Sequence, residues 1–158
     1  MTIVGVSGHQ RLPAIAVALA ERELRLLFAD LDGPLIGLSS LAIGADQLFA
    51  QLILDTGGEL HAVIPAVGFE KTFDDNARSS YFALLSKATQ VTTLDYPMPS
   101  EEAYDAAGRF VVDHCDLLFA VWDGKPARGP GGTADAVGYA RELHRRVQVS
   151  WPPNAERD

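Results

Sequence analysis

Leu117–Trp122 (LLFAVW) leads directly into Asp123–Thr133 (DGKPARGPGGT), and a helical pattern over Ala134–His144 follows. The first segment is a short apolar run, typical of a buried strand. The glycines of the second can turn backbone N–H groups toward one point, with the first turn of a helix behind them, a geometry that binds phosphate. A plain glycine-rich connection explains the same residues, so this stretch alone leaves both interpretations open.

The order of strand, glycine-containing turn and helix recurs along the whole chain. Apolar and β-branched runs predict strands at Thr2–Val6, Leu35–Ser40, Leu60–Pro65, Gln90–Leu94, Leu117–Trp122 and Val147–Trp151. Apolar residues at helical spacing predict helices at Pro13–Phe28, Ala45–Asp55, Ala77–Ala88, Glu101–His114 and Ala134–His144. Parallel neighbours need crossovers long enough to hold a helix. The sequence therefore predicts an α/β fold, a three-layer, doubly wound, mostly parallel sheet of about six strands, as in Rossmann-like proteins.

Size and charge limit the classes of function. A chain of 158 residues, 47% of them hydrophobic, can form one domain with a sizeable core, which we expect at residues 1–151 with a frayed tail at 152–158. The net charge is −8. Nucleic acids and anionic membranes are bound by clustered Lys and Arg, and the acidic net charge argues against such a cluster. We therefore expect neither as a partner.

Cysteine usage and the amino terminus indicate the compartment. Cys115 is the only cysteine, which excludes an intramolecular disulfide and a cysteine-rich zinc site. The chain leads straight into the apolar Ile3–Val6 without the basic and apolar regions of a leader peptide. We expect a cytoplasmic protein with no metal site and no required cofactor.

Ligands of doubly wound sheets bind outside the carboxyl ends of the strands. The loops that follow four predicted strands are Gly5–Arg11, Ser39–Asp46, Pro65–Asn76 and Asp123–Thr133, and they are rich in Gly, Ser, Thr and charge. We expect them to meet at one edge of the sheet, with Ala66–Asn76 as a flap. The candidate ligand-binding residues are Gly8, His9, Arg11, Ser39, Ser40, Gly44, Asp46, Arg128, Gly131, Gly132 and Thr133.

Several of these candidates also have structural explanations. The Gly5–Gly8 turn is not the full dinucleotide-binding fingerprint, which has three glycines and a later acidic residue. Asp46 lies in the first turn of a predicted helix, where a carboxylate commonly caps the helix or braces a loop. Thr133 is placed equally well as a helix cap or as a donor to a phosphate oxygen. Arg128 can face a phosphate or solvent.

Taken together, these loops resemble the superfamily that groups the DNA-processing Smf (DprA) proteins with the Lonely-guy phosphoribohydrolases, also called lysine-decarboxylase-like or SLOG-type domains. Ser39–Asp46 (SSLAIGAD), with Gly57-Gly58 and Ala62–Pro65 downstream, is similar to the Smf-type Ser-Gly-x-Ala-x-Gly-x-Asp segment. Pro130–Thr133 (PGGT) is similar to a shortened Pro-Gly-Gly-x-Gly-Thr-x-x-Glu motif of the phosphoribohydrolases. The resemblance covers about Ile3–Val149.

The resemblance implies a nucleotide-binding Rossmann-like fold, with phosphate at Gly131, Gly132 and Thr133, and a homodimer, for which Phe82, Leu84 and Leu85 could supply the contact. At the position of the family's glutamate this chain has Ala136. Our leading hypothesis is therefore binding of a nucleotide or nucleotide-derived phosphorylated small molecule. One alternative is a nucleoside 5′-monophosphate phosphoribohydrolase with Asp135 or Asp123 as the catalytic carboxylate. Another is a non-catalytic structural or partner-recruiting subunit.

Overall fold

The computed structural model describes residues 1–127 and 132–156. The strands are β1 (Thr2–Gly8), β2 (Leu35–Ser39), β3 (Glu59–Ile64), β4 (Gln90–Thr93), β5 (Leu117–Val121) and β6 (Arg146–Ser150). In these ranges the helices are α1 (Ala14–Asp30), α2 (Ala45–Asp55), α3 (Asp75–Lys87), α4 (Glu101–His114) and α5 (Thr133–Glu142), with a short 3₁₀ helix η1 (Phe69–Thr72).

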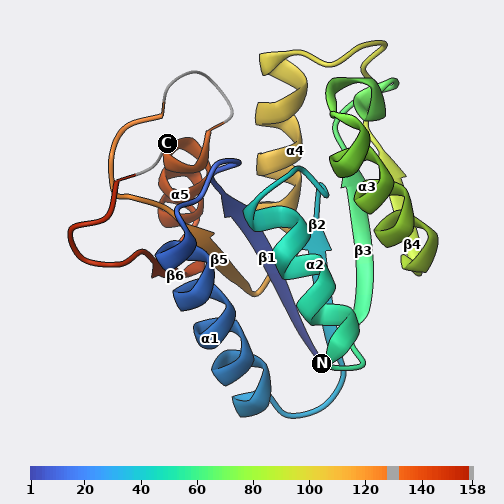
Figure 1. Ribbon diagram of the computed structural model, residues 1–158. Helices are drawn as coiled ribbons and strands as arrows, with labels where there is room; N and C mark the ends of the chain where they lie inside the picture. The colour runs from blue at the N-terminus through green and yellow to red at the C-terminus, as the bar shows by residue number, and fades with distance from the viewer. Residues whose placement is uncertain (128–131, 157–158) are drawn as a thin grey trace.

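All six strands form one parallel sheet in the order β4-β3-β2-β1-β5-β6. Figure 1 shows it running through the centre of the molecule between two layers of helices. The predicted Rossmann-like α/β fold is therefore confirmed. The differences lie at element ends: α3 begins at Asp75, two residues earlier than predicted, because Asp74 caps it by accepting a hydrogen bond from the Ala77 amide.

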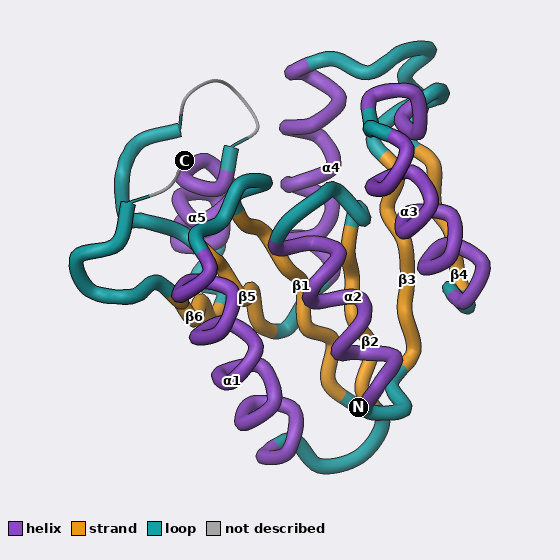
Figure 2. Tube along the Cα trace, in the orientation of Figure 1, coloured by secondary structure: helices purple, strands orange, loops and turns teal. Residues whose placement is uncertain are grey.

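The two helical layers bury separate faces of the sheet (Figure 2). On one face α1, α2 and α3 pack against the strands around the fully buried Leu24 and Phe49. On the other face α4 and α5 pack around Val112 and Val137. Strands buried on both faces read as continuous apolar runs, which is why β5 is apolar throughout.

The direction of winding reverses beside β1. From β1 the chain adds β2, β3 and β4 in one direction, and α4 then carries it back to β5 on the other side of β1. Such a reversal point leaves a crevice between the loops that follow the two neighbouring strands. Here these are the loops after β1 and after β5, whose strand ends Gly8 and Val121 are paired.

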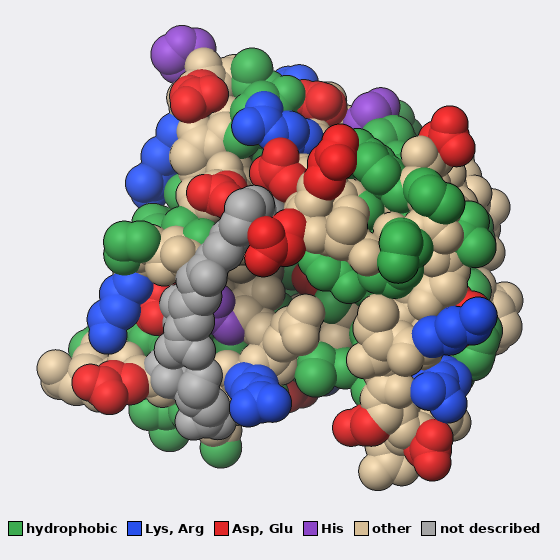
Figure 3. Space-filling model, turned by 90° about the horizontal axis from the view of Figure 1, so that it is seen from above, with side chains coloured by type: hydrophobic (Ala, Val, Ile, Leu, Met, Phe, Trp, Pro, Cys, Tyr) green, Lys and Arg blue, Asp and Glu red, His purple; other side chains and the backbone are tan. Residues whose placement is uncertain are grey.

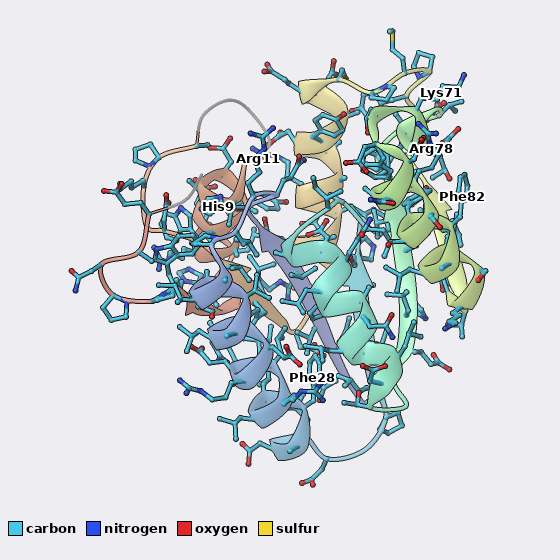
Figure 4. The ribbon with its side chains drawn as sticks, in the orientation of Figure 1. His9, Arg11, Phe28, Lys71, Arg78 and Phe82 are labelled. Carbon is cyan, nitrogen blue, oxygen red and sulfur yellow. The ribbon has the colours of Figure 1, made fainter. Side chains whose placement is uncertain are left out.

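The segment after β6 and the outer face of α3 lie at the periphery of the fold. After β6 the chain folds back, since the Trp151 indole donates a hydrogen bond to the Ala155 carbonyl and Pro152 is buried. On α3, Leu84 belongs to the core and Phe82 is exposed, so of these two only Phe82 is available for a dimer contact (Figure 4).

Over the described ranges, no helix combines the length and the apolar character needed to cross a membrane.

Candidate functional site

A cavity of about 440 Å³ lies at the carboxyl-terminal edge of the sheet, at the reversal point beside β1. Figure 3 looks onto this edge and shows it hollowed near the centre, with acidic side chains around part of the rim. The described lining residues are Val6, Ser7, Gly8, His9, Gln10, Ser40, Ala42, Asp46, Pro65, Phe69, Tyr104, Ala107, Gly108, Val111, Ala127, Gly132 and Thr133. Small-molecule sites typically measure roughly 300–1,000 Å³.

The end of β1 forms one wall of the cavity. Ser7 donates a hydrogen bond from its hydroxyl to the Thr133 hydroxyl oxygen, over 3.2 Å. At Gly8 a β-carbon would overlap the Ala45 β-carbon at the start of α2 and lie 3.0 Å from the Val121 β-carbon. Gly8 is thus required for the close approach of α2 and β5 to β1, and this approach places Asp46 of α2 beside the end of β1 in the cavity wall.

The start of α5 forms the adjoining wall. Gly132 is the N-cap residue and Thr133, only 5% exposed, is the first residue of the helix. The amides of Asp135 and Ala136 already donate to the Gly132 carbonyl. The amides of Thr133 and Ala134 precede the helical hydrogen-bond pattern and carry the positive end of the helix dipole. The Ser7 and Thr133 hydroxyls and this helix start suit an anionic group.

His9 joins the loop after β1 to the loop after β5. The Asp123 amide donates to His9 Nε2 at 3.2 Å, and the Asp123 Oδ1 atom lies 3.3 Å from the same nitrogen. Both side chains are buried, and the His9 ring meets Trp151 edge to face. Figure 4 labels His9 on the loop that joins β1 to α1. His9 lines the cavity, whereas Asp123 lies behind it and accepts a hydrogen bond from the Lys125 amide.

Asp46 contributes the only carboxylate among the described lining residues. Burial raises its pKa from 3.8 to about 7, although a hydrogen bond from the Ala42 backbone opposes the shift. The loop-bracing role that the sequence suggested for Asp46 stays a prediction. The N-cap of α2 is Gly44. A carboxyl group with a pKa near neutrality in a cleft is a candidate functional group.

The other residues of the Ser39–Asp46 loop have different surroundings. Ser39 is fully buried below the cavity, where its hydroxyl donates to the Asp46 carbonyl and accepts from the Leu41 amide. Its neighbour Ser40 lines the cavity. Gly44, at φ +82°, packs against the backbone carbonyls of His9 and Gln10 and holds the two loops together.

The remaining predicted residues lie outside the described cavity wall. Arg11 is exposed on the loop after β1 (Figure 4), and Asp135 is exposed in the first turn of α5. Arg128 and Gly131 fall outside the described residues. Among the lining residues that the structure describes there is no Lys or Arg. Backbone amides, the Ser7 and Thr133 hydroxyls and the His9 ring are the polar groups that an anion could meet in the described wall.

Sequence reasoning missed the far wall of the cavity. Phe69 from η1 and Tyr104 from α4 line it, with ring centroids 6.1 Å apart, together with Ala107 and Val111. The predicted flap over Ala66–Asn76 was a partial indication of Phe69. No feature of the sequence indicated that Tyr104 lines a cavity, because its position depends on how α4 crosses the sheet. The far wall is apolar and aromatic.

Neither thiol chemistry nor metal binding has support in residues 1–127 and 132–156 of the structure. Cys115 is buried, and burial raises the pKa of its thiol to about 11, so the reactive thiolate is disfavoured. Within these ranges no group of His, Cys, Asp and Glu has an arrangement that could hold a metal ion.

Comparison with known proteins supports the fold. No family model matches the chain, and no curated protein matches its sequence. DNA processing protein A (DprA) from Streptococcus pneumoniae superimposes with a TM-score of 0.74 at 20% identity, covering 94% of this chain and 50% of that one. The Helicobacter pylori DprA, described as binding single-stranded DNA, gives 0.72 at 16% identity, over 99% of this chain and 68% of that one. This chain has the DprA fold.

A second kind of protein shares this fold. The molybdenum cofactor carrier protein from Chlamydomonas reinhardtii superimposes with a TM-score of 0.59 at 16% identity, covering 94% of this chain and 75% of that one. These structures confirm at the level of fold the resemblance predicted from the loop motifs. The chain spans half the length of the S. pneumoniae DprA structure.

Proposed function

We propose that this chain binds a nucleotide or a nucleotide-derived phosphorylated small molecule in the cavity beside β1. The observation that carries the proposal is the division of this one cavity between two chemistries. The start of α5 and the Ser7 and Thr133 hydroxyls suit a phosphate, and the apolar wall at Phe69 and Tyr104 suits a planar base. A protein of net charge −8 holds an anion by such local groups.

The solved relatives are consistent with ligand binding by this fold. One is described as binding single-stranded DNA and another as a cofactor carrier. We favour a small ligand over DNA, because DNA affinity depends on many phosphate contacts from Lys and Arg, whereas the described cavity wall has none. A single-stranded oligonucleotide therefore belongs in the same binding panel, and tight, salt-dependent binding of it would contradict this choice.

Binding is tested by thermal unfolding in the presence of AMP, GMP, CMP and NAD. A ligand that binds only the folded chain stabilises it by about 2.7 kcal/mol at a hundredfold excess over its dissociation constant. If none of the four shifts the transition, the chain is better explained as a structural or partner-recruiting subunit. Chromatography of the same mixtures tests base release, and sustained release would favour the phosphoribohydrolase alternative.

Thr133→Val should weaken binding of phosphorylated ligands about tenfold or more, because a hydrogen bond to a charged group contributes about 1.5–3 kcal/mol. The variant keeps the shape of the side chain and removes the hydroxyl at the start of α5. Calorimetry should show the loss for AMP and leave adenosine, which has no phosphate, unchanged.

The matched control is Thr93→Val, an exposed threonine at the end of the edge strand β4, outside the cavity. It should bind AMP like the parent chain. Equal affinity of Thr133→Val and the parent for AMP would show that the phosphate does not lie at the start of α5.

A further inference from the structure

Asp46 does not fit a phosphate-binding role in the cavity. Two like charges that share one cavity destabilise one another, and the described cavity wall has no Lys or Arg to compensate them. Apart from the Ala42 backbone group, no residue in the described part of the chain donates a hydrogen bond to the Asp46 carboxylate. Its oxygens are acceptors available to a ligand that offers N–H donors.

We propose that Asp46 reads the base of the bound nucleotide by accepting two adjacent N–H donors, so that the preferred ligand carries a guanine-type edge. This inference rests on the proposed function and assigns the polar groups of the cavity to different parts of the ligand. Thr133 and the start of α5 hold the phosphate, and Asp46 selects the heterocycle.

The arrangement of hydrogen-bond donors on each base determines which base the Asp46 carboxylate prefers. An ionised carboxylate only accepts hydrogen bonds. Guanine presents N1–H beside its 2-amino group, two adjacent donors that a carboxylate can accept together. Adenine and cytosine present an amino donor beside a ring-nitrogen acceptor, and uracil presents one donor between two carbonyl acceptors. Hydrogen bonds to an ionised partner are about twice as strong as neutral ones, which favours the guanine pattern.

The aromatic wall of the cavity fits the same ligand, because the partly exposed Tyr104 ring can stack on a base and the buried Phe69 ring, 4% exposed, packs against it. Phe69 and Tyr104 line the same cavity as Asp46 and are held by ring contacts, with Phe69 also packed against Tyr81 at 5.8 Å between centroids. Stacking on aromatic rings binds any base and gives little selectivity. A hydrogen-bonding group beside a stacking surface supplies the selectivity that stacking lacks.

Three side chains in the described wall are titratable, and one of them is Asp46, whose pKa burial raises to about 7. The other titratable lining side chains are His9, from the loop after β1, and Tyr104, whose pKa burial raises further. On α3, which packs against α2, Arg78 donates to the carbonyls of Glu70 and Phe73. The first two turns of α1 carry no titratable residue.

Calorimetry at pH 8 with GMP, IMP, AMP and CMP tests the inference on the whole chain. GMP should bind tightest, and IMP, which lacks the 2-amino group, should bind about tenfold more weakly or worse. Asparagine offers one donor and one acceptor, so Asp46→Asn should lower the GMP-to-AMP affinity ratio about ten- to hundredfold. In the parent chain this ratio should rise about tenfold from pH 6 to pH 8 as the carboxyl ionises, and in Asp46→Asn it should stay constant.

Using a ratio of two monophosphates cancels the ionisation of the phosphate itself. Asp55→Asn, an exposed position on the same helix and outside the cavity, is the matched control and should keep the parent ratio. If nucleotides bind but the ratio is the same in Asp46→Asn and independent of pH, the base-reading role is wrong and the proposed function stands. If no nucleotide binds the parent chain, both are wrong.

Discussion

Asp46→Asn should raise the free energy of unfolding at pH 8 by about 2–4 kcal/mol and leave it nearly unchanged at pH 4. Burial raises the pKa of this carboxyl from 3.8 to about 7. Three pKa units correspond to about 4 kcal/mol, at 1.36 kcal/mol per unit. Solvent in the open cavity screens the partly buried Asp46 carboxylate, so the expected gain extends down to about 2 kcal/mol.

The sign follows from proton binding. Between pH 4 and pH 7 the folded chain keeps the Asp46 proton while the unfolded chain has lost it, so raising the pH destabilises the folded state. Above pH 7 the Asp46 carboxyl is ionised in both the folded and the unfolded chain, and the free energy of unfolding falls no further on this account. Asparagine has nearly the same shape, can still accept the hydrogen bond from Ala42, and never ionises. Its advantage should therefore grow from pH 4 to pH 7 and then remain constant.

Urea unfolding of the parent, Asp46→Asn and Asp55→Asn chains at pH 4, 6 and 8 measures this difference. Asp55→Asn should follow the parent at every pH, because Asp55 is exposed and its removal changes no buried charge. A loss of stability in Asp46→Asn at all three pH values would mean that the carboxylate mainly braces the loop before α2. A stability advantage of Asp46→Asn over the parent that grows with pH would show that the ionised Asp46 carboxylate lowers stability, as is typical of groups placed for function.

The fold could be predicted because its determinants are local. The apolar run Leu117–Val121 and the helical period of Ala45–Asp55 are visible in short windows. Glycines and prolines between such segments separate one element from the next. The alternation of strands and helices then leaves few sheet topologies. Element ends were less exact, because a side-chain cap such as Asp74 competes with the helical period.

The site could be predicted only in outline, because it depends on contacts between distant segments. Ser39 and Ser40 are equivalent in the sequence, but successive side chains of an extended segment point to opposite sides, and only Ser40 lines the cavity. Asp135 lies two residues after Thr133, about 200° around the helix, and is exposed. The burial of Asp46 results from the approach of loops far apart in the chain, which no short window contains.

Gly8→Ala should lower the free energy of unfolding by about 1–3 kcal/mol, the usual effect of overpacking. The added methyl group would overlap the Ala45 β-carbon and crowd the Val121 β-carbon at 3.0 Å. Both β-carbons are fixed directly to the backbone, so no change of rotamer can relieve the contact. The strand β1 and the start of α2 must move apart instead, and Asp46 follows Ala45 in α2.

This displacement links the stability of the fold to the geometry of the site, so Gly8→Ala should also weaken GMP binding. Gly138→Ala is the matched control, since a β-carbon there meets no atom within 4 Å and alanine favours the helical conformation. It should raise stability by up to about 1 kcal/mol and leave GMP binding unchanged. Urea unfolding and calorimetry of both variants give the comparison. Parent-like stability and affinity in Gly8→Ala would mean that β1 and α2 are separable, and that the close approach at Gly8 does not set the position of Asp46.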